Sequence, residues 1–139
     1  MKRTRFAFIG IVFLLLCSCG GISRDVKKGD IAGVQQYLAN GGDINWKSQT
    51  GNTPIMMAAS VPGNGKMVEF LCQKGADLNV RNMNGATALI LATYYNHIDS
   101  VSALVKCKAD RNIKDMFGRT ALDYAEQYEY TRIIELLKD

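Results

Sequence analysis

The side chains best suited to chemistry in this chain of 139 residues are four cysteines and a single histidine. Cys17 and Cys19 follow an apolar N-terminal segment, which leaves Cys72 and Cys107 in the body of the chain. Cys72 falls at a helical position that Val105 occupies elsewhere, and this predicts a buried, inert thiol. Cys107 falls two positions further along, at the exposed end of a helix, where a free thiol could be reactive.

His97 has no second ligand at metal-binding spacing, so no metal site is predicted around it. Its place before Ile98 suggests that the ring satisfies backbone groups where a helix begins. Asp43, Asp77 and Asp110 recur at one repeated position, which indicates turn-holding hydrogen bonds. No set of nucleophile, base and acid can be assembled, and no phosphate-binding loop is present. We therefore expect no enzyme, no cofactor, no metal and no small-molecule substrate.

The elements around these residues repeat at a fixed spacing. Gly51, Gly85 and Gly118 are 34 and 33 residues apart, and each opens a similar segment. The three segments read Gly-Asn-Thr-Pro-Ile-Met-Met-Ala-Ala, Gly-Ala-Thr-Ala-Leu-Ile-Leu-Ala-Thr and Gly-Arg-Thr-Ala-Leu-Asp-Tyr-Ala-Glu. Such a period is typical of a stacked array, which has no natural catalytic pocket. The repeat therefore favours a binding surface over an enzyme.

Each repeated unit predicts two helices. Thr53, Thr87 and Thr120 stand at N-cap positions of a first helix, and Pro54 follows the first of them, where its missing N–H costs nothing. The second helix carries apolar residues at positions i, i+3 and i+4, which form one buried face. This face comprises Val34, Tyr37, Leu38, Val68, Leu71, Cys72, Val101, Leu104, Val105, Ile134 and Leu137.

The position just beyond the second helix predicts a left-handed backbone, which glycine adopts without strain. Gly41 and Gly75 occupy this position in two units, whereas Lys108 replaces the glycine in the next. A non-glycine residue in that conformation costs on the order of 1 kcal/mol. We therefore expect the substitution to lower stability without changing the fold.

With its period, its caps and segments such as Gly-Ala-Asp-Leu-Asn over 75–79, the chain resembles the ankyrin repeat family over residues 20–139. The resemblance implies an all-α fold of helix pairs with β-hairpin fingers. It implies a short solenoid of about four units, near 22–47, 48–81, 82–114 and 115–139, of which the first and last are partial. The Thr-Pro-Leu-His of the family is never intact, so a link between neighbouring repeats is missing. At least three units are needed for a stable shared core.

The repeat spacing also bears on the two internal thiols. Equivalent sites in adjacent helix pairs lie roughly 10 Å apart, whereas a disulfide needs Cα atoms within about 7 Å of each other. We therefore expect Cys72 and Cys107 to remain free.

Residues 1–18 predict a cleaved signal peptide, because basic residues precede an apolar run over 6–16 that is short for a transmembrane span. The Leu-Cys-Ser-Cys that follows resembles a bacterial lipobox. This resemblance implies cleavage before Cys19 and acylation of its thiol, with 19–21 as a lipidated N-terminus and short tether. Cys17 is the competing acylation site, disfavoured because a leucine precedes it, and an uncleaved anchor is the third reading. The lipobox implies a bacterial cell envelope, with the protein lipid-anchored to a membrane and facing the periplasm or the cell surface.

The net charge of +4 belongs mostly to this leader. Loss of residues 1–18 removes three basic residues and no acid, which leaves a net charge of +1. A nearly neutral domain of about 120 residues gives no support for nucleic-acid binding.

In the ankyrin family, the finger tips and the exposed side of the first helices form a concave binding surface. The framework needs no large apolar groups there, whereas Tyr and Arg dominate binding hot spots. Alternatively, rings such as Phe117 and Tyr128 simply cover the end of a short array, and Trp46 is either an interface residue or a plug for the first unit. The second unit contributes Lys47, Gln49, Thr50 and Asn52 to this surface. The predicted partner-binding residues of the later units are Arg81, Met83, Tyr94, Tyr95, Lys114, Met116, Phe117, Arg119 and Tyr128.

The sequence thus predicts a membrane-anchored module that displays a concave ankyrin surface to a protein partner. An alternative is a periplasmic redox or stress-protection accessory that acts through the free thiol of Cys107. Delivery to another cell as an effector is a third possibility, which a lipid anchor disfavours.

Overall fold

The computed structural model describes residues 18–139, so the predictions on residues 1–17 lie outside it. Over the described residues the chain forms eight helices and no strand. In order they are α2 (Ser18–Lys28), α3 (Ile31–Ala39), α4 (Pro54–Ala59), α5 (Gly65–Gln73), α6 (Ala88–Tyr94), α7 (Ile98–Lys106), α8 (Ala121–Gln127) and α9 (Thr131–Lys138). The predicted all-helical class and the short solenoid are both confirmed.

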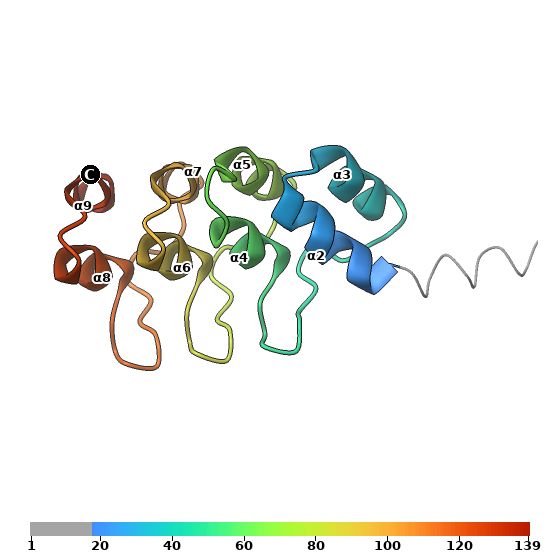
Figure 1. Cartoon of the computed structure of the whole chain (residues 1–139). Helices are drawn as coiled ribbons and strands as arrows, with labels where there is room; N and C mark the ends of the chain where they lie inside the picture. The colour runs from blue at the N-terminus through green and yellow to red at the C-terminus, as the bar shows by residue number, and fades with distance from the viewer. Residues whose placement is uncertain (1–17) are drawn as a thin grey trace, which may run out of the picture.

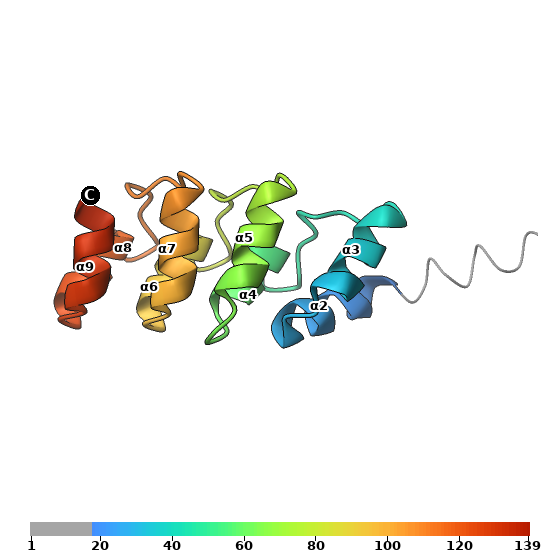
Figure 2. The ribbon, with the colours of Figure 1, turned by 90° about the horizontal axis from the view of Figure 1, so that it is seen from above.

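The helices form two layers of antiparallel partners. Helices α2, α4, α6 and α8 make the layer next to three projecting loops, and α3, α5, α7 and α9 make the opposite layer (Figure 1). Seen from above, the helices of the second layer stand side by side in a row (Figure 2). We call the three loops, at 40–53, 74–87 and 107–120, the first, second and third fingers.

The fingers are closed turns, and none of the described residues forms the β-hairpin strands that the family resemblance implies. Two backbone hydrogen bonds lie within each turn, and the outer one has N···O distances of 3.0, 3.0 and 2.9 Å in the three fingers. The donors and acceptors are Ser48 to Asn52, Asn82 to Ala86, and Asp115 to Arg119. The inner bond of each turn runs from Gly51, Gly85 or Gly118 N back to the residue that opens the turn, so both bonds belong to the turn and do not extend into a strand ladder, which needs repeated pairing along two chains.

The core lies between the two layers and runs the length of the stack. Val34, Val68, Leu71, Val101 and Leu104 of the predicted apolar face have no exposed surface. In α9 the fully buried residue is Ile133, one position before the predicted Ile134, which is half-buried. The predicted Leu137 is also buried, so the predicted period places the buried face correctly, with Ile134 in place of Ile133 as its one misplaced residue in α9.

Two of the three predicted threonine caps form their hydrogen bonds. Thr87 Oγ1 accepts from Ile90 N at 3.3 Å, and Thr120 forms a reciprocal capping box with Asp123. Thr53 occupies the N-cap position of α4 but makes no side-chain cap, and its buried hydroxyl has no partner. The prediction for Thr53 is therefore right in position and wrong in its hydrogen bond.

The turns of the stack use left-handed backbone at three equivalent sites of the repeat, one of which is the finger glycine Gly51, Gly85 or Gly118. Beyond the second helices, Gly41, Gly75 and Lys108 have φ of 83°, 86° and 63°, as predicted. Between the two helices of each pair, the left-handed residues are Gly29, Gly63, Asn96 and Glu129. Lysine and glutamate tolerate this backbone less well than glycine or asparagine, so strain is concentrated in the last two units.

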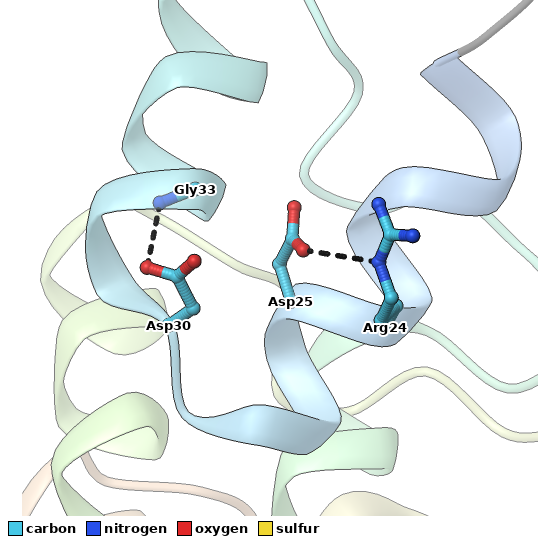
Figure 3. A network of polar contacts seen from close by, with 4 residues as sticks. All are labelled: Arg24, Asp25, Asp30 and Gly33. Atoms are coloured by element: carbon cyan, nitrogen blue, oxygen red, sulfur yellow. Dashed lines mark hydrogen bonds and ion pairs between the residues drawn. The ribbon is translucent and has the colours of Figure 1, made fainter.

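Two carboxylates lie around Gly33 in the first helix pair (Figure 3). Asp30 caps α3 by accepting from Gly33 N at 3.0 Å, and Asp25 lies 3.7 Å from Arg24 Nε. A Cβ at Gly33 would come within 2.9 Å of an oxygen of each aspartate, so a side chain there would push them apart.

Residues 19–21, the predicted tether, lie within α2, and Ile22 is already buried in the core. None of the helices in residues 18–139 has the length and apolar character needed to cross a membrane.

Candidate protein-binding face

The exposed apolar residues gather on the finger side of the last two units. Among the described residues there are seven exposed large hydrophobic side chains, and six belong to the predicted binding set. The seventh is Ile98, at the start of α7 in the opposite layer. We call the predicted set the finger face: Arg81, Met83, Tyr94, Tyr95, Lys114, Met116, Phe117, Arg119 and Tyr128.

The finger tips contribute the most exposed apolar groups. Met83, Met116 and Phe117 are 74%, 62% and 67% exposed. Met83 and Met116 occupy equivalent positions of the second and third fingers, and Phe117 follows directly. Met and aromatic side chains are enriched at protein interfaces. Solvent exposure of this size offers the fold no burial energy, so the framework gives no reason for apolar residues at these tips.

The tyrosines at the ends of α6 and α8 form one connected cluster. The Tyr94 ring meets Tyr95, Tyr124 and Tyr128 edge-to-face, with centroid distances of 5.2, 5.6 and 6.0 Å. Tyr128 also stacks on Tyr130 at 5.6 Å. Aromatic pairs favour such geometries and gain about 0.5–1.5 kcal/mol beyond their burial. The rings therefore hold one another in place while their outer faces remain exposed.

Arg119 joins the tyrosine cluster to the third finger. Its guanidinium carbon lies 4.5 Å from the centroid of the Tyr124 ring and 5.2 Å from that of Phe117. Its Nη1 donates to Gln127 Oε1 at 2.8 Å. A cation held between two rings gains from both quadrupoles. The exposed Phe117 is thereby continuous with the rings on α8.

Beneath the face lies a buried polar pair that the sequence analysis missed. Tyr124 donates its hydroxyl to Asp115 Oδ2 at 2.5 Å, and both residues are buried. Burial raises the pKa of Asp115, but the Tyr124 hydroxyl, the backbone N–H groups of Arg119 and Phe117 and the Arg119 charge outweigh it, so the pKa is lowered. Burial, with the Asp115 hydrogen bond, raises the pKa of Tyr124 to about 12. A sequence signal existed, because a tyrosine replaces the Met57 and Leu91 of the earlier units.

The same position organises the turn of every finger. Ser48, Asn82 and Asp115 are equivalent in the repeat, and each side chain accepts from backbone N–H groups of its own turn. Asp115 is the member of the three that carries a charge and also reaches Tyr124. The side chain that holds the turn in every finger thus also links the third finger to α8, through the hydrogen bond between Tyr124 and Asp115.

Neighbouring fingers are tied to each other, which makes the row of fingers rigid. Met83 N donates to Thr50 O at 3.1 Å, and Met116 N donates to Asn84 O at 3.0 Å. A Cβ at Gly85 would lie 2.8 Å from Met116 N, so the second and third fingers pack backbone to backbone there. The predicted framework aspartates are confirmed, because Asp43, Asp77 and Asp110 each accept from the backbone N–H two residues on.

His97 and Trp46 have structural roles in the stack. The His97 ring lies 3.0 Å, through Nδ1, from Ala59 O in the preceding unit, and it stacks on Tyr95 at 5.9 Å. The predicted role in satisfying backbone is confirmed, although the carbonyl ends a first helix of the neighbouring unit. Trp46 is half-buried against the core, which favours the plug interpretation. In residues 18–139 no group of three or more His, Cys, Asp or Glu side chains could hold a metal ion.

The predicted absence of a disulfide between Cys72 and Cys107 is confirmed, although the two thiols lie closer together than the repeat spacing suggests. Both cysteines are free and half-buried, and the Cys107 thiol is close enough to Cys72 to influence its pKa. The spacing argument compared equivalent positions, whereas Cys107 lies two residues beyond the equivalent of Cys72 and reaches back toward it. Burial and the neighbouring thiol raise the pKa of Cys72. A raised pKa keeps the thiol protonated and therefore unreactive at neutral pH.

Comparison with known proteins agrees with this geometry. A family model described as ankyrin repeats in three copies matches residues 22–115 and 63–139. Human ankyrin repeat domain-containing protein 63 is 36% identical over 66 residues, which are 45% of this chain and 17% of that protein. A putative ankyrin repeat protein of Rickettsia bellii is 30% identical over 92 residues, 62% of this chain and 54% of that protein.

The mouse 2-5A-dependent ribonuclease is also similar, with 41% identity over 70 residues. The match covers 50% of this chain but only 9% of that enzyme. The chain spans 54% or less of the length of each of these three relatives.

Proposed function

The chain belongs to the ankyrin repeat family, whose repeats form protein–protein interaction modules, and we propose that it binds a protein partner through the finger face. One observation carries the proposal: six of the seven exposed large hydrophobic side chains in the described residues fall on this face. Exposed apolar groups that gather on one side of a soluble fold are typical of an interaction site. Their fixed geometry suits recognition of a folded or extended partner.

Order within the face supports the proposal, because ordering side chains on binding costs free energy. Immobilising a rotamer-rich side chain costs about 0.5–1.5 kcal/mol. Tyr94, Tyr128 and Arg119 are already held by ring contacts and by the bond to Gln127. A partner therefore meets a surface that has lost much of this entropy during folding.

The test compares the loss of exposed apolar side chains at two places, the finger face and the start of α7. The native partner is first captured by crosslinking, identified and purified. Its Kd is then measured for the wild type, for Tyr95→Ala with Phe117→Ala, and for Ile98→Ala as the matched exposed apolar control. Loss of two hot-spot rings is expected to weaken binding by about 100-fold or more, while Ile98→Ala changes it little. Circular dichroism checks that every variant keeps its helices. Equal affinity for wild type and double variant would mean that the face is placed wrongly.

We further propose that the protein is held at a membrane of the bacterial cell envelope through acylated Cys19. Support comes from the lipobox-like Leu-Cys-Ser-Cys and from the position of Cys19 in α2. Three residues of helix rise only about 4.5 Å, and Ile22 is already part of the core. An acylated Cys19 would therefore hold the array directly against the bilayer.

Mass spectrometry of the mature protein tests the anchor. We expect an N-terminus at Cys19 that carries acyl chains, and loss of membrane association in Cys19→Ser. Cys17→Ser is the matched control and should remain acylated. An unmodified mature N-terminus, or acylation at Cys17 instead, would contradict the proposal.

A further inference from the structure

The fingers carry a row of cations with a regular spacing. Lys47, Arg81 and Lys114 occupy equivalent positions of the three fingers, 34 and 33 residues apart, and all three are exposed. The described ion pairs are Arg24 with Asp25 and Lys138 with Glu126, so the row has no carboxylate partner within residues 18–139. Arg81 Nε donates to Gly85 O of its own turn at 3.1 Å, and the charge of Lys114 helps to lower the pKa of Asp123, but no direct ion pair among the described residues neutralises the row.

Charge is distributed unevenly between the fingers and the rest of the array. The finger segments 47–52, 81–86 and 114–119 hold four of the 14 basic residues in 18–139 and one of the 13 acids. That acid is Asp115, whose oxygens accept from Tyr124 and from two backbone N–H groups. Because Asp115 is buried, it offsets little of the outward-facing charge. The nearly neutral domain thus presents one basic edge.

Apolar groups lie between the cations of this edge. Met83, Met116 and Phe117 follow Arg81 and Lys114 within three residues and are among the most exposed side chains of the fold. The finger-to-finger hydrogen bonds from Met83 and Met116 keep the spacing fixed. Helix pairs stack roughly 8–10 Å apart. An extended segment in the polyproline II conformation rises about 3.1 Å per residue and completes a turn in three residues, so every third side chain lies about 9 Å further along the same face.

We propose that this edge docks an extended, acidic protein segment, with carboxylates opposite Lys47, Arg81 and Lys114 and apolar side chains against Met83, Met116 and Phe117. The proposal rests on the proposed function and specifies the chemistry of the partner. A carboxylate at about every third residue of the segment would meet the row in register. Apolar residues between the carboxylates would cover the methionines and the phenylalanine. A protein segment suits this mixed edge better than a polyanion, whose backbone offers no apolar side chains to the finger tips.

The test uses synthetic peptides of three Glu-Leu-Ser units, with Gln-Leu-Ser and Lys-Leu-Ser peptides as neutral and reversed controls. Fluorescence anisotropy gives the affinity of each for the mature domain, at low and at high salt. We expect measurable binding of the glutamate peptide alone, and a loss of affinity with salt because exposed charge pairs are screened. Lys47→Glu with Lys114→Glu should weaken it roughly tenfold or more. The matched control, Lys66→Glu with Lys106→Glu, changes the net charge equally on α5 and α7 and should have little effect.

Equal binding of the glutamine peptide, or equal loss in the control variant, would overturn the proposal. So would tighter binding to single-stranded polynucleotide or to vesicles of anionic lipid than to the glutamate peptide. The captured native partner separates this inference from the proposed function. Suppose that Tyr95→Ala with Phe117→Ala abolishes binding of the native partner, while Lys47→Glu with Lys114→Glu leaves it unchanged. The finger face is then supported as the binding site, and the proposal of an acidic partner segment is refuted. If neither double variant changes the affinity, both the binding face and the acidic partner segment are refuted.

Discussion

The first two helix pairs and the last two share one framework but use it differently. In the first half, the left-handed residues next to the helix ends are all glycines: Gly29, Gly41, Gly63 and Gly75. In the second half, the equivalent residues are Asn96, Lys108 and Glu129. The second half also carries the tyrosine cluster and Phe117, whereas the equivalent positions of the first half, such as Thr50, Met57 and Val61, hold no aromatic ring.

A second difference concerns the core. Thr93 and Ser100 of the second half are fully buried, and their hydroxyls have no hydrogen-bond partner, whereas among the described residues of the first half only the Thr53 hydroxyl is in this state. The equivalents of Thr93 and Ser100 in the preceding unit are Ala59 and Met67, which are apolar. An unsatisfied buried hydroxyl costs about 1–3 kcal/mol. The half that displays the binding residues is therefore the half that departs most from the framework, as expected where function competes with stability.

The largest expected effect tests what the halves share. Leu71 and Leu104 are equivalent residues of α5 and α7 with no exposed surface. Truncation of either to alanine should lower the free energy of unfolding by about 2–5 kcal/mol, since it leaves a cavity in a short array. Urea denaturation followed by circular dichroism measures both variants. A loss of only a few tenths for Leu104→Ala would show that the second half is not part of one cooperative core.

An intermediate effect tests the buried pair that only the second half contains. Because the pKa of Asp115 is lowered in the folded state, its carboxylate stabilises the fold above about pH 4, the ordinary range for aspartate. This stabilisation should be lost as the pH falls through the lowered value. Asp115→Asn should cost about 1–3 kcal/mol at neutral pH and flatten the acid limb of a stability–pH profile. The pKa of Asp123 is lowered as well, by hydrogen bonds from Thr120. The acid limb of the stability–pH profile of Asp123→Asn therefore serves as a comparison for that of Asp115→Asn.

The free energy of unfolding at alkaline pH depends on the ionisation of Tyr124. Its pKa is raised to about 12, so the folded state holds the proton above pH 10, where the unfolded chain releases it. Stability should therefore fall between about pH 10 and 12, and Tyr124→Phe should remove that part of the fall. An unchanged alkaline limb in the variant would argue against a buried, protonated hydroxyl.

The smallest effect tests the turn strain directly. Glu129 and Gly63 occupy equivalent left-handed turns, with φ of 58° and 71°. Glu129→Gly should stabilise the fold by up to about 1 kcal/mol, and Gly63→Ala should destabilise it by a similar amount. Thermal unfolding of the two variants gives both signs in one experiment. Destabilisation by Glu129→Gly would mean that the glutamate side chain contributes more than its backbone costs.

Periodicity explains what the sequence could predict. It placed the helix pairs, the capping threonines, the left-handed Lys108 and the apolar tips, because each depends on position within a repeat. It could not predict the bond from Tyr124 to Asp115 or the placement of Arg119 between two rings, because these depend on which rotamers meet across a finger and a helix. The contact between Cys72 and Cys107 was missed for the same reason, since equal spacing describes backbones and not side-chain tips.

The strained turn at Glu129 lies between α8 and α9, next to Tyr128, and α9 has a neighbour on one side only. In stacked repeats a terminal unit opens more readily than an interior one, because it shares a single interface. The last pair is therefore the part of the stack most prone to fraying, and it supports three of the five rings of the tyrosine cluster. A ligand that covers Phe117 and Tyr128 would stabilise the last pair against local unfolding. Protection of α9 from proteolysis should therefore rise with the fraction of protein that is bound to the ligand.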